Sequence, residues 1–553
     1  MEHVQGGVRL HMRKWITLLI FNAIAILLVS GCSEQGEKNI KVPVDEEHVA
    51  ILTVENFYLQ KKTDSKQTYF SLVEDRTYKY NILDKGEKMG ELTVTTRKLE
   101  NGDVFLFTKL RNYGKNSLNG KISIKLPKVN RYELNDWDQR FTKHVHNKTT
   151  GVDETTNPIG LVKAYLYDIE KYNIVLSKNY ISRELVKNYE NEKASIVREL
   201  ISEEKNFYIS VNSENVNFVL PLRSTGNDIS ENWILFSKDQ LFENEDNLER
   251  WIDYHIDHYQ RANSWLTAEG PYKKLPWSIE PATKKGYGRN LGLMQDKAAL
   301  DNFEEHRERY FYDLVLNSVA DLYAYKQKKG TAIWETEYTS TWLNKAYSTK
   351  APYIDTRHNE YIALFLTRVG NLLNIDELKK AETVYGDYLV EQVKVGNTIG
   401  VGEGYLIADY FSPYDHAMKT HASMNHILGG VNILVNCYIS TGDRRYLDVA
   451  LNIRKGIEEL GSQWIRDSGD IWYQVNPDLT FGGNDYEQLT LIDLLTTQSL
   501  FEKVNIKRSE MLDRFIRSKA SYLIREKKEI YPYVIDMLKE QGFGDVFSLR
   551  FPQ

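Results

Sequence analysis

The run HASMNHILGGVNILVNCYISTGDRRYLDVALNIRKGIEEL, residues 421–460, decides the fold of the C-terminal half. Its apolar residues recur every three or four positions, as on one face of a helix, both before and after the joint Thr441-Gly442-Asp443. Two long helices joined by so short a segment lie antiparallel and pack against each other. The run therefore predicts a pair of neighbouring helices.

The same alternation of long helix and short joint continues over residues 245–545. Paired helices of this kind either stack as a solenoid or close into a ring, the α/α toroid, whose joints gather at its two ends. The joints here are rich in aromatic and charged residues that would line a bowl, so we expect an all-α toroid as the catalytic domain. The other expected helices are Asn247–Leu266, Asp301–Gln327, His358–Leu373, Ile375–Val393, Tyr486–Lys503 and Lys507–Lys527.

Residues 46–240 carry a different pattern, of short runs rich in β-branched and aromatic residues such as TYKYNIL and DVFLFTKLRNY. Turn signals such as Glu100-Asn101-Gly102 separate these runs. We predict one or two β-sandwich or barrel-like units here, with helical insertions near residues 160–170 and 190–205. The expected class is therefore α+β multidomain, with a β-sandwich or barrel-like N-terminal half before the toroid. A length of 553 residues agrees with several domains.

The first residues carry the features of a secretory signal. Basic residues Arg13 and Lys14 precede a long apolar run that ends in Val29-Ser30-Gly31-Cys32. We expect residues 1–32 to be a signal peptide with a lipobox, cleaved before a lipid-carrying Cys32, and residues 33–45 to be a tether. A membrane-spanning anchor is the alternative, although the run is near the short limit for spanning. The expected location is extracytoplasmic, anchored by lipid to a bacterial cell membrane.

Composition narrows the class of partner. The net charge of −6 is small for this length and gives no indication of nucleic-acid binding, whereas 36 tyrosines and 10 tryptophans offer flat rings that suit sugar faces. We predict a polysaccharide partner and leave a homodimer open. The chain has no P-loop, dinucleotide fingerprint, G-x-S-x-G or H-E-x-x-H motif, so we expect no cofactor. Cys437 lies in an apolar helical run and is expected to be a buried free thiol.

The segment GYLIADYFSPYDHAMKTHASMNHILGG, residues 404–430, places Asp409, Tyr410 and Asp415 before a helix expected to begin near Thr420–His421. The N-terminus of a helix favours anions, so these residues form a candidate acid/base group beside a negatively charged substrate. Helix capping and solvated loop charge are the alternative.

A metal is not expected in this segment. His421 and His426 are five residues apart and so lie on different helix faces, unlike the four-residue pair that binds zinc. Asn425 and His426 are predicted to be polar residues at the inner end of the toroid.

Two further joints hold candidate residues. The run DIWYQVNPDLTFGGND, residues 470–485, predicts a short hairpin with a Gly-Gly turn, and Tyr473 and Tyr486 are its candidate catalytic phenols. Half-buried structural tyrosines are the alternative. In residues 352–360, Asp355 or Thr356 is suited to cap the next helix. Arg357 follows and could hold a substrate carboxylate through two hydrogen bonds, or form an ordinary surface salt bridge.

These joints, taken in order, resemble the D-glucuronyl C5-epimerase family. That family has a segment E-Y-P before a helix, and Asp409-Tyr410-Phe411 before NHILGGVNILVNCYISTGD is similar to it. It then has S-G-x-I-Y-D and W-D-Y, which Ser468-Gly469-Asp470-Ile471-Trp472-Tyr473 and Asn484-Asp485-Tyr486 resemble. The similarity is clearest over residues 400–500. The sequence departs from the family at Asp409, where the family has Glu, and at Glu487-Gln488-Leu489-Thr490, which replaces a His-rich continuation.

The resemblance implies an isomerase that inverts C5 of hexuronic acid residues, such as glucuronic acid in a glycosaminoglycan-like polysaccharide. It implies catalytic roles for Asp409, Tyr410, Tyr473 and Tyr486, and a β-rich front before an α/α toroid. A phenolate base needs nearby cations or donors, which Arg357 or His421 could supply, and we expect Arg357, His421 and Asn425 to bind substrate.

Three functions stay open at this point. The same carbanion could expel the 4-O-linked sugar, which would make the protein a polysaccharide lyase. A glycoside hydrolase could use Asp409, Asp415 or Glu403 as its carboxylates. A lipoprotein that only binds glycans would need no catalytic residues.

Overall fold

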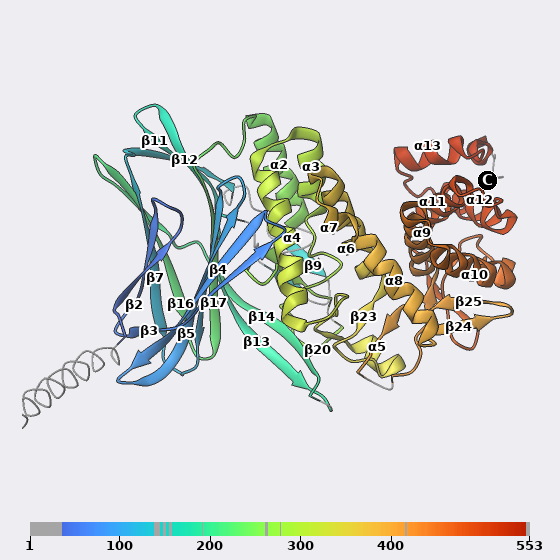
Figure 1. The fold of residues 1–553 in the computed structure, drawn as a ribbon, viewed down its shortest axis with the longest axis horizontal. Helices are drawn as coiled ribbons and strands as arrows, with labels where there is room; N and C mark the ends of the chain where they lie inside the picture. Colours follow the sequence, from blue (N-terminus) through green and yellow to red (C-terminus); the bar gives the residue numbers. More distant parts are fainter. Residues whose placement is uncertain are drawn as a thin grey trace, which may run out of the picture.

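The computed structural model describes residues 36–137, 144–147, 151–153, 158–190, 192–259, 264–276, 278–414 and 417–548. A β-rich N-terminal half and a helical C-terminal half lie at opposite ends of the long axis (Figure 1), so the predicted α+β class is confirmed. The predicted signal segment with Cys32 lies outside the described residues, as do Asp415 and His416. Within the ranges given above, none of the helices has the length and apolar character needed to cross a membrane.

A five-stranded antiparallel sheet forms the outer layer of the β half, in the order β1–β2–β7–β16–β15. Strand β1 pairs with β2 along its whole length, so residues 39–43 of the predicted tether belong to the folded sheet. The strands are β1 (Asn39–Pro43), β2 (Val49–Val54), β7 (Leu118–Pro127), β15 (Tyr208–Val211) and β16 (Asn215–Ser224).

A thirteen-stranded sheet forms the second layer, and its main path runs β18–β19–β21–β14–β13–β17–β6–β5–β4–β3. Strand β12 attaches at β17, and β11 and β8 follow it. The strands are β3 (Tyr58–Tyr69), β4 (Val73–Asp84), β5 (Glu87–Leu99), β6 (Val104–Asn112), β8 (Arg131–Asp136), β11 (Gly160–Leu166), β12 (Ile169–Leu176), β13 (Asn179–Asn188), β14 (Ala194–Glu204), β17 (Asp228–Ser237), β18 (Ser264–Trp265), β19 (Tyr272–Lys274) and β21 (Gly286–Gly288).

The predicted helical insertions near residues 160–170 and 190–205 are wrong, because β11, β12 and β14 occupy those segments. Charged residues in β14 gave the segment a helical appearance. Arg198, for example, is buried in the sheet because it pairs with Glu231 at 3.1 Å. Long-range strand pairing here outweighs local propensity.

The core of the predicted sandwich lies between the two sheets. Leu52 and Ile124 of the small sheet pack toward Val94 and Leu106 of the large sheet, and all four side chains are buried. Each contributes about 1.5–3 kcal/mol to folding by leaving water. The opposite face of the large sheet packs against helices α2 and α4, so the order of layers is sheet, sheet, helices (Figure 1).

The helical half consists of neighbouring helix pairs, as the opening run predicts. Helix α9 ends at Thr441, Gly442 takes a left-handed conformation with φ of 72°, and Asp443 caps α10 by accepting a hydrogen bond from the amide of Arg445 at 3.0 Å. The longer helices are α2 (Glu245–Tyr259), α3 (Lys297–His306), α4 (Arg309–Lys329), α6 (Thr356–Leu373), α8 (Ala381–Lys394), α9 (Met424–Thr441), α10 (Arg444–Leu460), α11 (Leu489–Lys503), α12 (Glu510–Arg525) and α13 (Pro532–Glu540). The short helices are α5 (Thr341–Tyr347) and α7 (Asp376–Lys379).

Inner and outer helices alternate. Helix α9 is buried on nearly all sides and contacts α6, α8, α10 and α11, whereas α10 and α12 each bury only one face. Cys437 is buried in α9 as a free thiol, as predicted. The pairing of helices is thus confirmed (Figure 1), while closure into a complete ring remains a prediction.

Short strands connect the joints between these helices. Strand β23 (Ile354–Asp355) pairs with β26 (Tyr410–Phe411), and β27 (Ala422–Ser423) pairs with β28 (Trp472–Val475), which pairs with β29 (Phe481–Asn484). Because residues 422–423 form β27, α9 begins at Met424 and not near Thr420–His421 as expected. The remaining strands are β9 (His144–Asn147), β10 (Gly151–Asp153), β20 (Ile279–Glu280), β22 (Thr339–Ser340), β24 (Thr398–Val401) and β25 (Gly404–Ile407).

Candidate functional site

The short strands bring three distant joints to one place. Asp355, before α6, lies opposite Tyr410 in the β23–β26 pair, and Ser423, before α9, lies opposite Gln474 in the hairpin that precedes α11. The predicted hairpin is confirmed, but Gly482 and Gly483 lie in β29 and not in its turn. A Cβ atom at Gly483 would approach the Cβ of Tyr473 to 2.9 Å, so glycine leaves room for that tyrosine.

The predicted tyrosines belong to one group of aromatic rings. The ring centroids are 5.8 Å apart for Tyr410 and His421, 6.1 Å for His421 and Tyr473, and 5.8 Å for Tyr473 and Tyr486. Tyr486 is 53% exposed, so the group opens to solvent at that end. We call this group the aromatic cluster; its members are Trp342, Tyr347, Tyr353, Tyr410, His421, His426, Tyr473 and Tyr486.

Asp409 is fully buried beneath the cluster. Its carboxylate accepts hydrogen bonds from the backbone amide of Ser423, at 2.8 Å, and from the Ser423 hydroxyl, and it lies 3.1 Å from Nε2 of His421. Burial acts to raise the pKa of Asp409, but His426, His421 and Ser423 outweigh it and lower the pKa overall. Asp409 is therefore an anion that binds Ser423, the residue before α9, and its carboxylate does not face solvent. This role is close to helix capping, the structural alternative to catalysis given above.

Asp409 also begins a chain of polar contacts that leads to Tyr347. His421 places Nε2 beside Asp409 and Nδ1 3.1 Å from the Tyr347 hydroxyl. His421 is fully buried, whereas Tyr347 is only partly buried. The predicted residue His421 thus positions a tyrosine at the edge of the cluster.

The hydrogen bonds around His426 fix its tautomer. The Thr356 hydroxyl donates to the carbonyl oxygen of Asp409 at 3.0 Å, so its lone pairs are left for Nδ1 of His426 at 2.8 Å. Nδ1 therefore carries the proton and Nε2 carries the lone pair. Burial lowers the pKa of His426, which keeps the ring neutral at pH 7, and its centroid lies 6.0 Å from that of Tyr410.

Arg357 is buried, which contradicts a surface salt bridge. Its guanidinium lies 2.8 Å from Glu360 and 2.9 Å from Asp493, and it donates to the carbonyl oxygen of Asn425 at 2.9 Å. A Cβ atom at Gly429 would overlap both Arg357 and Glu360, so glycine is required for this approach to α9. Burial raises the pKa values of Glu360 and Asp493, although Arg357 lowers them in part.

The N-termini of three inner helices meet at Arg357. Arg357 is the second residue of α6, Asn425 is the second residue of α9, and Asp493 lies near the start of α11. Asp355 caps α6, as predicted, by accepting from the amide of His358 at 3.0 Å. Because each helix N-terminus carries partial positive charge, this arrangement favours an anion.

A cavity of about 740 Å³ opens beside Arg357, between α3, α6 and α11. Among its lining residues, Nε of Arg357 and Oε1 of Gln295 are buried without a hydrogen-bond partner in the described part of the chain, and Oδ2 of Asp493 has only its ion pair with Arg357. Oδ1 of Asn425, whose carbonyl oxygen accepts from Arg357, is likewise buried without a partner there. Within the same residues there is no group of three or more side chains of the kinds that bind metals. The helix N-termini around Arg357 favour an anionic ligand, and the residues that line this cavity include no member of the aromatic cluster.

The sequence indicated only part of this site. It identified Asp409, Tyr410, Tyr473, Tyr486, Arg357, His421 and Asn425, which the structure brings to one region, but assigned no role to Tyr347, Glu360 or Asp493. One signal was available, because Asp493 is a charged residue inside the apolar run LTLIDLL, where burial requires a partner.

Comparisons with known proteins show only distant similarity to solved structures. No family model and no curated protein matches the chain. An α-1,6-mannanase variant from Salegentibacter sp. HEL1_6 is 11% identical, with a TM-score of 0.31 over 43% of this chain and 62% of that chain. Cellobiose 2-epimerase from Bacillus thermoamylovorans B4167 is 14% identical, with a TM-score of 0.29 over 39% of this chain and 56% of that chain. A family 76 glycoside hydrolase (mannosidase) from Bacteroides thetaiotaomicron VPI-5482 is 15% identical, with a TM-score of 0.32 over 49% of this chain and 75% of that chain. All three are carbohydrate-active enzymes.

Proposed function

We propose that the protein inverts C5 of hexuronic acid residues in a polysaccharide by removing and returning a proton. The observation that supports this most is the convergence of Tyr410, Tyr473 and Tyr486 on the helix N-termini around Arg357. A polyuronide brings one carboxylate per uronic residue, which such a positive region favours. The lipid anchor at Cys32 and an extracytoplasmic location remain part of the proposal.

The substrate carboxylate needs a positive field, because the proton to be removed lies α to it and charge develops there as an enediolate. The helix N-termini contribute to that field. Because burial raises the pKa of Glu360, this carboxyl group is largely protonated at neutral pH, and Arg357 then faces only one ionised partner, Asp493. The unpartnered Nε of Arg357 and Oδ1 of Asn425 offer one donor and one acceptor for orienting the sugar.

The proton transfer needs a base on one face of the sugar and an acid on the other. His426 suits the base, because it is neutral and its Nε2 lone pair has no partner among the described residues. Burial raises the pKa values of Tyr410 and Tyr473, so both phenols stay protonated at neutral pH and suit the acid. In this scheme Asp409 and His421 are positioning residues, and the tyrosines donate protons where the resemblance suggested a phenolate base.

The test compares polyuronides before and after incubation with the enzyme. We expect a new C5 epimer by proton NMR, with no unsaturated uronide by absorbance and no new reducing ends. Tyr410→Phe should abolish the new epimer, whereas Tyr405→Phe, at a half-buried tyrosine of β25, should leave it unchanged. No new epimer from any polyuronide of a panel would refute the proposal.

A specific observation favours glycoside hydrolysis as a second candidate. Glu360 and Asp493 lie on the same guanidinium beside the cavity, and a carboxyl group with a raised pKa is suited to protonate a leaving group. This reaction predicts new reducing ends that Glu360→Gln abolishes. Epimerisation predicts no new reducing ends, with or without the Glu360→Gln substitution.

A further inference from the structure

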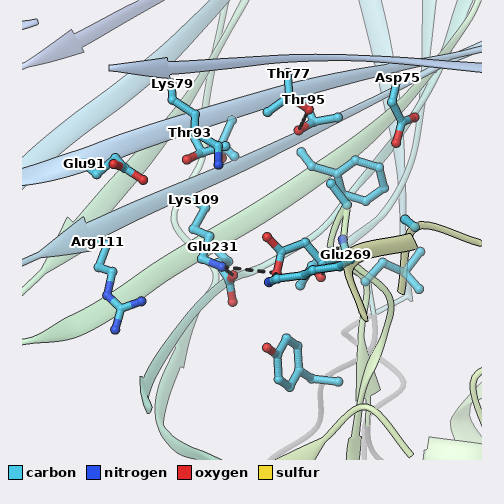
Figure 2. Close-up of a pocket in the computed structure, with 18 of the residues that line it drawn as sticks. Asp75, Thr77, Lys79, Glu91, Thr93, Thr95, Lys109, Arg111, Glu231 and Glu269 are labelled. Atoms are coloured by element: carbon cyan, nitrogen blue, oxygen red, sulfur yellow. Dashed lines mark hydrogen bonds and ion pairs between the residues drawn. The ribbon is translucent and has the colours of Figure 1, made fainter. Parts of the chain in front are cut away.

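A second cavity, of about 610 Å³, lies in the β half, and Figure 2 labels ten of the side chains that line it. It is bounded by strands β4, β5, β6 and β17 of the large sheet, by residues 266–269 and by the end of α4. None of its lining residues belongs to the aromatic cluster or to the cavity beside Arg357. It is therefore a separate candidate site.

The sheet presents a polar row to this cavity. Lys79 of β4 pairs in register with Thr93 of β5, Thr93 with Lys109 of β6, and Lys109 with Glu231 of β17. Paired residues on neighbouring strands point to the same face, so the four side chains cross the sheet side by side (Figure 2). At about 4.8 Å between strands, the row spans roughly 14 Å, which suits an extended ligand.

Almost every charged side chain that lines the cavity forms an ion pair, either with another lining residue or with a residue just behind the lining. Lys109 lies 3.7 Å from Glu231 and 3.8 Å from Glu269, and Arg111 lies 2.7 Å from Glu184. Further pairs are Asp75 with Arg97, Glu91 with Lys62 and Lys88, Glu231 with Arg198, Glu269 with Lys328, and Arg289 with Glu337.

Lys79 is the exception. Among the residues that the structure describes, its ammonium group has no ion pair and no hydrogen bond, although its charge acts at longer range on Glu91, whose pKa it helps to lower. Thr93, its register partner, also has no side-chain hydrogen bond among those residues. At the rim, Tyr113 is 45% exposed and lies 5.9 Å from the guanidinium of Arg111. The cavity thus offers one free cation, hydrogen-bonding groups of both kinds and one exposed ring.

We propose that this cavity binds an oligosaccharide stretch that carries a carboxylate, as a second site for the polymer. Lys79 would hold the carboxylate, Thr93 and Glu231 would bond hydroxyl groups, and Tyr113 would stack on a sugar ring. A sugar's hydroxyl groups both donate and accept, so they suit a surface where charges of both signs alternate. A phosphate monoester carries about −1.5 to −2 charges at pH 7, which a single lysine balances less well than the one charge of a carboxylate. The choice of a hexuronate as the carboxylated sugar rests on the proposed function, whereas the cavity and its free lysine do not.

A second binding site should change the KM only for substrates long enough to reach both sites. A chain held in the β half has a high effective concentration at the aromatic cluster, which lowers the KM for polymer without changing kcat. A disaccharide cannot occupy both sites, so it gains nothing from the β half.

Calorimetric titration of the full chain with a heparosan hexasaccharide tests the site. Lys79→Gln should weaken binding at one of two sites at least tenfold. The matched control is Lys125→Gln, at an exposed lysine of β7 in the other sheet. Maltohexaose, a neutral probe of the same length, should bind at least tenfold more weakly than the hexuronate probe and should not respond to Lys79→Gln.

Several outcomes would overturn the proposal. These are binding that Lys79→Gln leaves unchanged, an equal effect of Lys125→Gln, or maltohexaose bound as tightly as the hexuronate probe. Failure of the proposed function would look different, because C5 chemistry would be absent while the lysine-dependent binding persisted. If both proposals hold, Lys79→Gln raises the KM for polymer and leaves kcat on short substrates unchanged.

Discussion

Replacing His426 with glutamine tests the assignment of the base. At the ordinary histidine pKa of 6.5, about three quarters of the imidazoles are neutral at pH 7, and burial lowers the pKa further. Almost every molecule therefore carries the Nε2 lone pair that the reaction needs. A positioned general base contributes about 10²- to 10⁴-fold to rate, so His426→Gln should lower kcat by at least about 10²-fold.

The structure separates this loss from loss of folding. The glutamine amide can still donate to Thr356, which accepts from His426 at 2.8 Å, so we expect at most about 1 kcal/mol of lost stability. The assay is the rate of C5 inversion in a polyuronide, with melting temperature measured in parallel, and the control is His306→Gln in the last turn of α3. A kcat within threefold of the parent, in a variant that melts normally, would refute the role of His426.

Three further predictions concern pH, the buried carboxyl groups and the contact between the two halves. Because the pKa of His426 is lowered and that of Tyr410 is raised above 10.0, neither group titrates between pH 6.5 and pH 10. In the Glu360→Gln variant, which removes the carboxyl group whose pKa is about 8, the rate of inversion should therefore stay level over that range; a decline centred inside it would contradict both assignments. Glu360→Gln should leave inversion within threefold at pH 7, because the carboxyl group is already protonated; complete loss would favour the hydrolase. Arg97→Leu should destabilise the protein by about 3–5 kcal/mol in urea unfolding, because it leaves Asp75 and Asp321, at 2.8 and 2.5 Å, buried without their cation; an unchanged midpoint would contradict this.

The helices of the C-terminal half could be predicted because their signal is local. The apolar period and the Thr441-Gly442-Asp443 joint lie within one run, and α9 and α10 follow it closely. Residues 160–205 could not be assigned in this way, since the strands there depend on partners such as β17, distant in sequence. A local pattern records periodicity and not the pairing that decides between helix and strand.

The site shows the same division. The order of Asp409, Tyr410, Tyr473 and Tyr486 indicated candidate residues, but their meeting depends on strands of only two residues, such as β23 and β26, which no periodicity can indicate. The tautomer of His426 was equally hidden, because it depends on a hydroxyl group from another helix.

The direct measurement is incorporation of deuterium at C5 of a polyuronide incubated with the enzyme in deuterated water. The proposed mechanism predicts one solvent deuteron at C5 of each inverted residue, with the Tyr410→Phe variant incorporating at least about 10²-fold more slowly. An unlabelled polymer across heparosan and related polyuronides, from enzyme that still binds them, would contradict proton transfer at C5 and leave the protein as a glycan-binding one.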